Sequence, residues 1–184
     1  MARVADELGV TAAAIYYYVP DKAGMIDLAV DAILTDLVTP GAEFGTWDER
    51  LRRWADDFFT LVSEHRGLGP QLARNPKGTT ALRLASLCVE LLCEAGMTPA
   101  EAIRAQAPLR WYVMGEFADQ LQNDRTARRF EVVPDIETAF PDLAELAVHL
   151  DALDQREVLL HGIDLFIAGF KAQIAAKQSD RATA

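Results

Sequence analysis

The chain has 184 residues, of which 51% are hydrophobic and 25% are charged, with a formal net charge of −10. This length and composition suit one domain with a sizeable core, or a small module and a larger one. The acidic balance argues against a protein that coats nucleic acid through bulk charge. It still permits a small DNA-binding element that works through a few placed contacts.

The cysteines and the N-terminus bear on the cellular compartment. Cys88 and Cys93 lie five residues apart on one expected helix, so they point in different directions and predict neither a disulfide nor a metal site. We expect both to be small buried hydrophobic residues. We expect no export signal, and no apolar run near the roughly 20 residues that span a bilayer. These features predict a cytoplasmic protein with no membrane partner and no cofactor.

Apolar residues recur at a spacing close to 3.6 over most of the chain, and no alternating β-branched run is present. The pattern predicts an all-α fold. Residues 124–140 contain three arginines without a clear period, which predicts a solvated loop rather than a nucleic-acid patch. Glycine and proline breaks divide the rest into expected helices at residues 2–8, 11–17, 21–37, 47–65, 68–74, 79–95, 99–123, 141–150 and 155–177.

Short motifs mark the ends of several of these helices. Thr46 with Glu49, and Thr98 with Glu101, are capping boxes, in which each side chain accepts a hydrogen bond from the other residue's backbone. Gly96 is expected to end the preceding helix in a left-handed conformation. Local sequence alone therefore predicts where the helices at residues 47 and 99 begin.

The first 22 residues predict two short helices joined by a tight turn. Val4, Ala5 and Leu8 share one face of the first helix, and Gly9 can take the positive φ of a turn. Thr11 is a good N-cap for the second helix. Two helices joined in this way form the helix-turn-helix plan, whose second helix is small enough to enter a DNA major groove.

The order of residues here resembles the DNA-binding signature of the TetR family of transcriptional regulators. The resemblance rests on Val4-Ala5-x-x-Leu8-Gly9-Val10-Thr11-x-x-x-Ile15-Tyr16-x-Tyr18-Val19-Pro20-x-Lys22. It implies base contacts from Thr11, Ala12 and Ala14, backbone contacts from Tyr16, Tyr17, Tyr18 and Lys22, and core positions for Ile15 and Val19. The ring of Tyr16 can alternatively be a packing aromatic, or do both.

One departure from the family pattern concerns the first helix. TetR-type domains begin with a further helix, whereas Met1 falls where family members carry an internal residue of the second helix. We therefore expect this sequence to lack the first helix, which leaves Val4, Leu8 and Ile15 without a packing partner if the chain is whole. Residues 1–37 carry two basic and six acidic side chains, a net charge of −4 that disfavours DNA. A small-molecule-binding homodimer without DNA binding is the alternative.

We expect residues 1–38 to form the truncated DNA-binding domain with its connecting helix, and residues 46–178 to form a ligand-binding and dimerisation domain. The second region resembles the C-terminal domain of the tetracycline repressor subclass. The matching motifs are Trp47-Asp48-Glu49-Arg50-Leu51, Ala95-Gly96-Met97-Thr98-Pro99-Ala100-Glu101-Ala102, Phe140-Pro141-Asp142-Leu143 and Asp164-Leu165-Phe166-x-x-Gly169.

That resemblance implies a homodimer in which two helices of each subunit form a four-helix interface. The corresponding helices here are residues 99–123 and 155–177. The second is apolar around much of its circumference, and a surface helix needs only one apolar stripe. Gly162 and Gly169, seven residues apart, can permit close helix approach. A central core helix in a monomer is the alternative reading of this pattern.

A small-molecule pocket is expected between the helices that begin near Trp47, Thr79 and Pro99. Arg110 is the candidate for polar specificity, and it could instead form a salt bridge or a dimer contact. Each aromatic candidate could equally be plain core. The pocket candidates are Trp54, Phe58, Leu61, Leu84, Cys88, Gln106, Arg110, Trp111 and Met114.

No metal-dependent ligand and no catalytic activity is expected. His65, His149 and His161 do not match the positions where the tetracycline repressor holds its drug–magnesium complex. The sequence has no nucleophile–base pair, zinc-protease motif or phosphate loop. Asp56 and Asp57 are adjacent on a helix and so face different directions. The leading prediction is a ligand-responsive repressor with operator DNA, a small-molecule inducer and a second copy of itself as partners.

Overall fold

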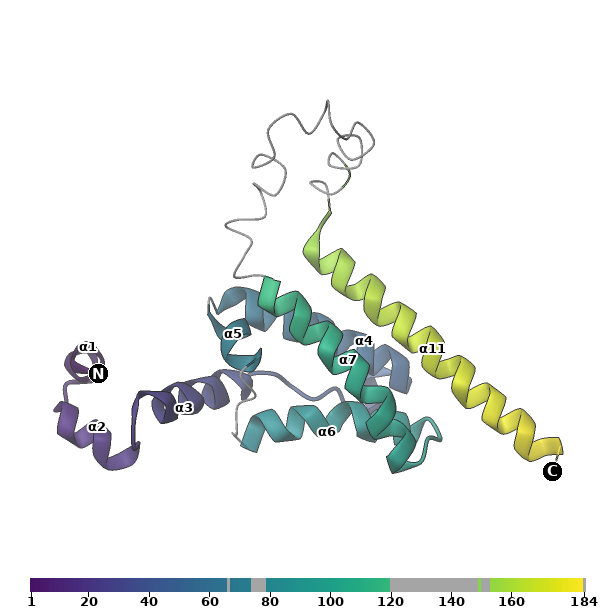
Figure 1. Cartoon of the computed structure of the whole chain (residues 1–184), viewed down its shortest axis with the longest axis horizontal. Helices are drawn as coiled ribbons and strands as arrows, with labels where there is room; N and C mark the ends of the chain where they lie inside the picture. The colour runs from purple at the N-terminus through teal and green to yellow at the C-terminus, as the bar shows by residue number, and fades with distance from the viewer. Residues whose placement is uncertain (66, 74–78, 120–148, 150–152, 184) are drawn as a thin grey trace, which may run out of the picture.

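The computed structural model describes residues 1–65, 67–73, 79–119, 149 and 153–183. These residues form helices and no strand, which confirms the all-α prediction. Three N-terminal helices project from a helical body, with the first two at the far end of the projection (Figure 1). The expected loop at residues 124–140 and nearly all of the expected helix at residues 141–150 lie outside the described residues.

The N-terminal helices are α1 (Ala2–Leu8), α2 (Ala12–Tyr18) and α3 (Lys22–Leu34). The helices α2 and α3 begin one residue later than predicted because Thr11 and Asp21 are their N-caps, with side-chain oxygens that accept backbone hydrogen bonds. The helix α3 also ends three residues before the predicted limit at Leu37. Its apolar stripe continues past the end of the helix, and Leu37 is buried without being helical.

The body contains a short 3-10 turn η1 (Ala42–Phe44) and the helices α4 (Trp47–Glu64), α5 (Leu68–Ala73), α6 (Thr79–Glu94), α7 (Pro99–Asp119) and α11 (Gln155–Thr183). The sequence did not predict η1. The starts of α4 and α7 confirm both capping boxes, since the backbone N–H groups of Thr46 and Thr98 donate to the carboxylates of Glu49 and Glu101 at 2.7 and 2.6 Å. Gly96 has the expected positive φ, at 105°.

The core of the body forms where the apolar faces of α4, α6, α7 and α11 meet. The C-terminal half of α3 joins it, because Val30, Leu34 and Leu37 belong to the same cluster of buried residues. The domain boundary at residue 38 stays a prediction. The largest fully buried side chains are those of Phe117, Leu34, Leu51, Leu91, Leu92, Leu159, Ile163 and Pro40.

Three ion pairs align α4 with α11 on the surface of the body. They join Asp48 to Lys171 at 2.5 Å, Arg52 to Asp164 at 2.9 Å and Asp56 to Arg156 at 2.6 Å. Residue numbers rise on α4 as they fall on α11, so the two helices run antiparallel. Exposed pairs add little stability individually, and their order here shows the antiparallel register that the shared core of the two helices imposes.

The helix α11 corrects one expectation from the sequence. Residues 155–180 are long and apolar enough to cross a membrane by length and composition, so the prediction of no such run was wrong. That test is weak for one helix, since core helices of other proteins also pass it. Only part of the apolar surface of α11 is buried within one chain, with Leu165 61% exposed. The remainder is available to a further partner.

Candidate nucleic-acid interface and ligand site

A tight turn at Gly9 joins α1 to α2. Gly9 has φ 65°, and its backbone N–H donates to the carbonyl of Asp6 at 3.2 Å. The Thr11 hydroxyl accepts from the N–H of Ala14 at 3.1 Å. Buried Ala5 and Val19 lie within this unit, and α1 packs on α2. The structure therefore contains the expected pair of short helices, with Val19 buried as predicted and Ile15 half-buried.

The predicted DNA-contact residues lie together on α2 and at the start of α3. Their side chains are exposed, except for half-buried Ala12. Tyr17 and Tyr18 are 85% and 81% exposed and their rings meet edge to face at 5.2 Å. Tyr16 is 48% exposed, less than its two neighbours. The helix α2 therefore exposes several hydroxyl-bearing side chains, and a cation, Lys22, follows at the start of α3.

The apolar face of α1 is partly open to solvent. Val4, Leu8 and Val10 are 37%, 65% and 45% exposed. Of the three residues expected to lack a packing partner, Val4 and Leu8 are exposed, whereas Ile15 is half-buried.

An aromatic cluster occupies the interior between α4 and α7. The rings of Trp54 and Phe58 stack at 5.2 Å with an interplanar angle of 8°, and Phe58 meets Phe117 edge to face at 5.1 Å. Three further pocket candidates, Leu61, Leu84 and Cys88, are buried in the same core. The indole N–H of Trp54 is buried and has no hydrogen-bond partner among the described residues.

The candidates on α7 divide between two environments. Gln106 and Met114 are half-buried, and Met114 packs against the core. Arg110 and Trp111 are exposed, with the Arg110 guanidinium 4.9 Å from the centre of the Trp111 ring. The structure therefore brings the other candidates to the interior or its margin and places this pair on the outside of α7. None of the three histidines approaches a cluster of metal ligands among the described residues.

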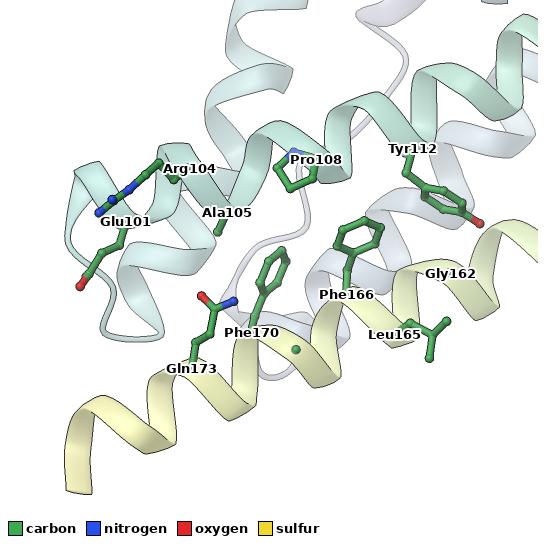
Figure 2. A pocket seen from close by; sticks show the side chains of 11 residues that line it. Glu101, Arg104, Ala105, Pro108, Tyr112, Gly162, Leu165, Phe166, Phe170 and Gln173 are labelled. Carbon is green, nitrogen blue, oxygen red and sulfur yellow. The ribbon is translucent and has the colours of Figure 1, made fainter. Parts of the chain in front are cut away.

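A groove that the sequence did not predict runs between α7 and α11, with a volume of about 670 Å³. Phe166 and Phe170 of α11 extend toward α7, and Pro108 lies on the opposite side (Figure 2). The polar side chains at the groove are Glu101, Arg104, Tyr112 and Gln173. Its apolar and glycine lining consists of Ala105, Pro108, Gly162, Leu165, Phe166, Gly169 and Phe170.

Tyr112 fixes the two helices at one end of this groove. Its hydroxyl donates to the carbonyls of Val158 and Leu159, at 2.9 and 3.3 Å. The ring lies directly on Gly162, where a Cβ would come within 2.2 Å of ring atoms. The close approach expected at Gly162 is therefore present inside one chain. At Gly169 a Cβ would meet open space. The signal that could have located the groove was the shared spacing of Glu101, Ala105, Pro108 and Tyr112 along one face of α7.

Comparison with known proteins identifies the body. The model of the tetracycline repressor-like C-terminal domain family matches residues 39–174. The chain is 30% identical over 132 residues to the HTH-type transcriptional repressor DrrR1 of Streptomyces coeruleorubidus, a match over 70% of this chain and 48% of the relative. The chain thus spans about half the length of that relative.

Two further comparisons extend over almost the whole chain. The tetracycline repressor protein class D of Escherichia coli is 24% identical over 184 residues, covering 95% of this chain and 80% of the relative. The crystal structure of the TetR family protein ActR of Streptomyces coelicolor with actinorhodin is 24% identical, with a TM-score of 0.74 over 95% of this chain and 87% of that one. At this identity the structural likeness concerns the fold. The resemblance seen in the sequence is confirmed: the chain belongs to the TetR family of transcriptional regulators, with a C-terminal domain of the tetracycline repressor type.

Proposed function

We propose that this protein is a ligand-responsive transcriptional repressor that binds operator DNA as a homodimer. The proposal rests on one observation. The helix α2 exposes its tyrosine side chains, and α3 connects it to a body of the tetracycline repressor type. No catalytic step is assigned to it. A DNA-binding role places the protein in the cytoplasm.

The helix α2 would be the recognition helix. Thr11, Ala12 and Ala14 would face the bases, since their small side chains let the backbone approach the major groove. Lys22 stands in the first turn of α3, where an ammonium group and free backbone N–H groups together favour a phosphate. The hydroxyls of Tyr16, Tyr17 and Tyr18 would contact the DNA backbone.

The interior aromatic cluster would be the ligand site. A buried N–H without an acceptor costs about 1–3 kcal/mol, so the Trp54 indole favours a ligand that supplies an oxygen acceptor. The stacked Trp54–Phe58 pair favours a flat aromatic ligand. We propose that Phe58, Leu61, Leu84 and Cys88 line this site. ActR, which shares the fold, crystallises in complex with the small molecule actinorhodin, and this agrees with a small-molecule inducer.

The remaining α7 candidates would have separate roles. Gln106 and Met114 would border the ligand, because they are half-buried beside the core. Arg110 and Trp111 lie outside it, and their exposure favours a subunit contact, an alternative already open for Arg110 from the sequence.

The α7–α11 groove would be the dimer interface. Its α11 side combines glycine at positions 162 and 169 with exposed Leu165, a surface that a helix from a second copy can approach closely. This partner would also cover the apolar surface of α11 that the single chain leaves open. Two copies would then place two α2 helices on successive major grooves, and a ligand-induced tilt of α3 would change their spacing.

The proposal can be tested by gel-shift binding of the purified protein to the DNA upstream of its own gene. A library of aromatic oxygen-bearing compounds is first screened for thermal stabilisation of the protein. We expect a shifted band that the stabilising compounds release. If none of the upstream fragments gives a shifted band at low salt, the repressor assignment is wrong. Stabilisation without DNA binding would favour the homodimer that binds small molecules alone.

A further inference from the structure

The helix α3 is the mechanical connection between the DNA-binding unit and the body. Of the three N-terminal helices, α3 makes the substantial contacts with the described body, and these are with α5 and α6. Its first eight residues, Lys22 to Ala29, contribute no buried side chain, and Leu28 is 58% exposed. Ile26 is half-buried and packs against the core, and full burial begins at Val30. The helix therefore leaves the body ahead of Ile26, and its N-terminal end projects outward (Figure 1).

A directional contact lies farther along α3, where the helix packs on the body. The carboxylate of Asp31 accepts a hydrogen bond from the backbone N–H of Thr80 at 2.8 Å, across 49 residues of sequence. Thr80 is in the first turn of α6. The first N–H groups of a helix have no partner within the helix, and a carboxylate placed there is favoured by both the hydrogen bond and the helix dipole. Asp31 therefore caps α6 from a different helix.

Apolar burial and this hydrogen bond constrain α3 differently. Contacts of Val30 and Leu34 with the core are non-directional, so they hold α3 against the body without fixing its angle sharply. A charged hydrogen bond restricts both distance and angle. Farther along, α6 also carries Leu84 and Cys88, two residues of the proposed ligand site. A shift of α6 would consequently reach α3 through Asp31.

We propose that Asp31 is a positioning residue that fixes the angle of α3 on the first turn of α6 and transmits movement of α6 to the recognition helix. The inference rests on the proposed function for its biological meaning, and its geometric content is independent of DNA, ligand and dimerisation. Asp31 touches neither DNA nor ligand.

The test measures the position of α2 relative to the body by spin labelling. Labels are placed at Tyr17→Cys on α2 and Glu64→Cys on α4, two exposed positions. Cys93→Ser removes the accessible native thiol, while burial raises the pKa of the Cys88 thiol to about 12 and keeps that group protonated and unreactive. Dilution with excess unlabelled protein leaves one pair of labels per particle even in a dimer.

Three variants are compared in this background. Asp31→Ala removes the acceptor, Asp31→Asn keeps an acceptor oxygen without charge, and Asp27→Ala removes an exposed carboxylate one turn earlier on α3. We expect the distance distribution to broaden or shift in Asp31→Ala, to change less in Asp31→Asn, and to match the wild type in Asp27→Ala. Hydrogen exchange at the Thr80 amide should rise about tenfold in Asp31→Ala, while exchange in α4 and α11 stays unchanged.

A merely stabilising role would change the thermal midpoint and the overall exchange rate without altering the distance distribution of the folded protein. An unchanged distribution in folded Asp31→Ala, or an equal change in Asp27→Ala, would overturn the proposal. If Asp31→Ala does not fold, Thr80→Pro carries the test by the same two criteria, because proline is tolerated in the first turn of a helix and removes the donor N–H of this contact. A changed distribution in a protein that binds no DNA would support the coupling and refute the repressor assignment.

Discussion

At the scale of single residues, the contact of Gly162 with Tyr112 predicts that one added methyl group at position 162 destabilises the fold. In Gly162→Ala the new Cβ must displace the Tyr112 ring and the hydrogen bonds of its hydroxyl to α11. We expect the free energy of unfolding to fall by about 1–3 kcal/mol in urea titration. Gly115→Ala is the control, because its Cβ meets open space in α7 and alanine favours a helix interior. An equal loss in both variants would contradict the assigned contact.

The ion pair and hydrogen bonds of Glu101 predict that the stability of the fold depends on pH. The side chain of Lys177 and the backbone and hydroxyl of Thr98 lower the pKa of Glu101 from 4.5 to about 2. A carboxylate with a lowered pKa stabilises the fold fully above its ordinary pKa, and this contribution disappears as pH falls toward its folded value. The wild type should therefore lose stability relative to Glu101→Gln between pH 4.5 and about 2, as followed by thermal unfolding. Glu7→Gln, in α1, controls for the change in net charge. Parallel curves of thermal midpoint against pH for the wild type and Glu101→Gln would show that the Glu101 carboxylate does not stabilise the fold.

At the scale of helices, the start of α3 predicts a defined electrostatic contribution to DNA binding. Replacing Lys22 by Met should weaken binding to all DNA sequences alike, because a phosphate contact carries no sequence information. The slope of log affinity against log salt should become shallower by about 0.9, the value for one phosphate contact. Fluorescence anisotropy at several salt concentrations measures this slope. Arg83→Met, on the exposed side of α6, is the control and should leave the salt slope unchanged. An unchanged slope in Lys22→Met would show that Lys22 does not contact DNA.

Helix ends were predictable from sequence because their causes are local. Thr46, Thr98 and Gly96 act within a few residues of themselves, and the structure confirms each one. The orientation of α7 was not predictable in the same way. Apolar residues occur on several of its faces, so periodicity could not tell that Trp111 faces outward while Phe117 is fully buried. That choice depends on which helices pack against α7, and those contacts are distant in sequence.

At the scale of the whole molecule, the α7–α11 groove predicts a dimer that one substitution can disrupt. Gly169→Arg has room in the single chain and would block a partner at the groove. Ala168→Arg places the same side chain on the exposed surface of α11 beside the groove lining. Light scattering should give twice the chain mass of 20.3 kDa for the wild type and Ala168→Arg, and a single chain mass for Gly169→Arg. A dimeric Gly169→Arg would place the interface elsewhere.

The burial of the second half of α3 has a consequence for building hybrid regulators. Val30, Leu34 and Leu37 belong to the core of the body although they precede the predicted boundary at residue 38. A foreign DNA-reading segment fused at residue 38 would remove all three and leave a cavity in the recipient. Leu→Ala changes in such positions each cost about 2–5 kcal/mol. The best position for exchanging operator specificity therefore lies inside the helix, ahead of Ile26, which already packs against the core of the body.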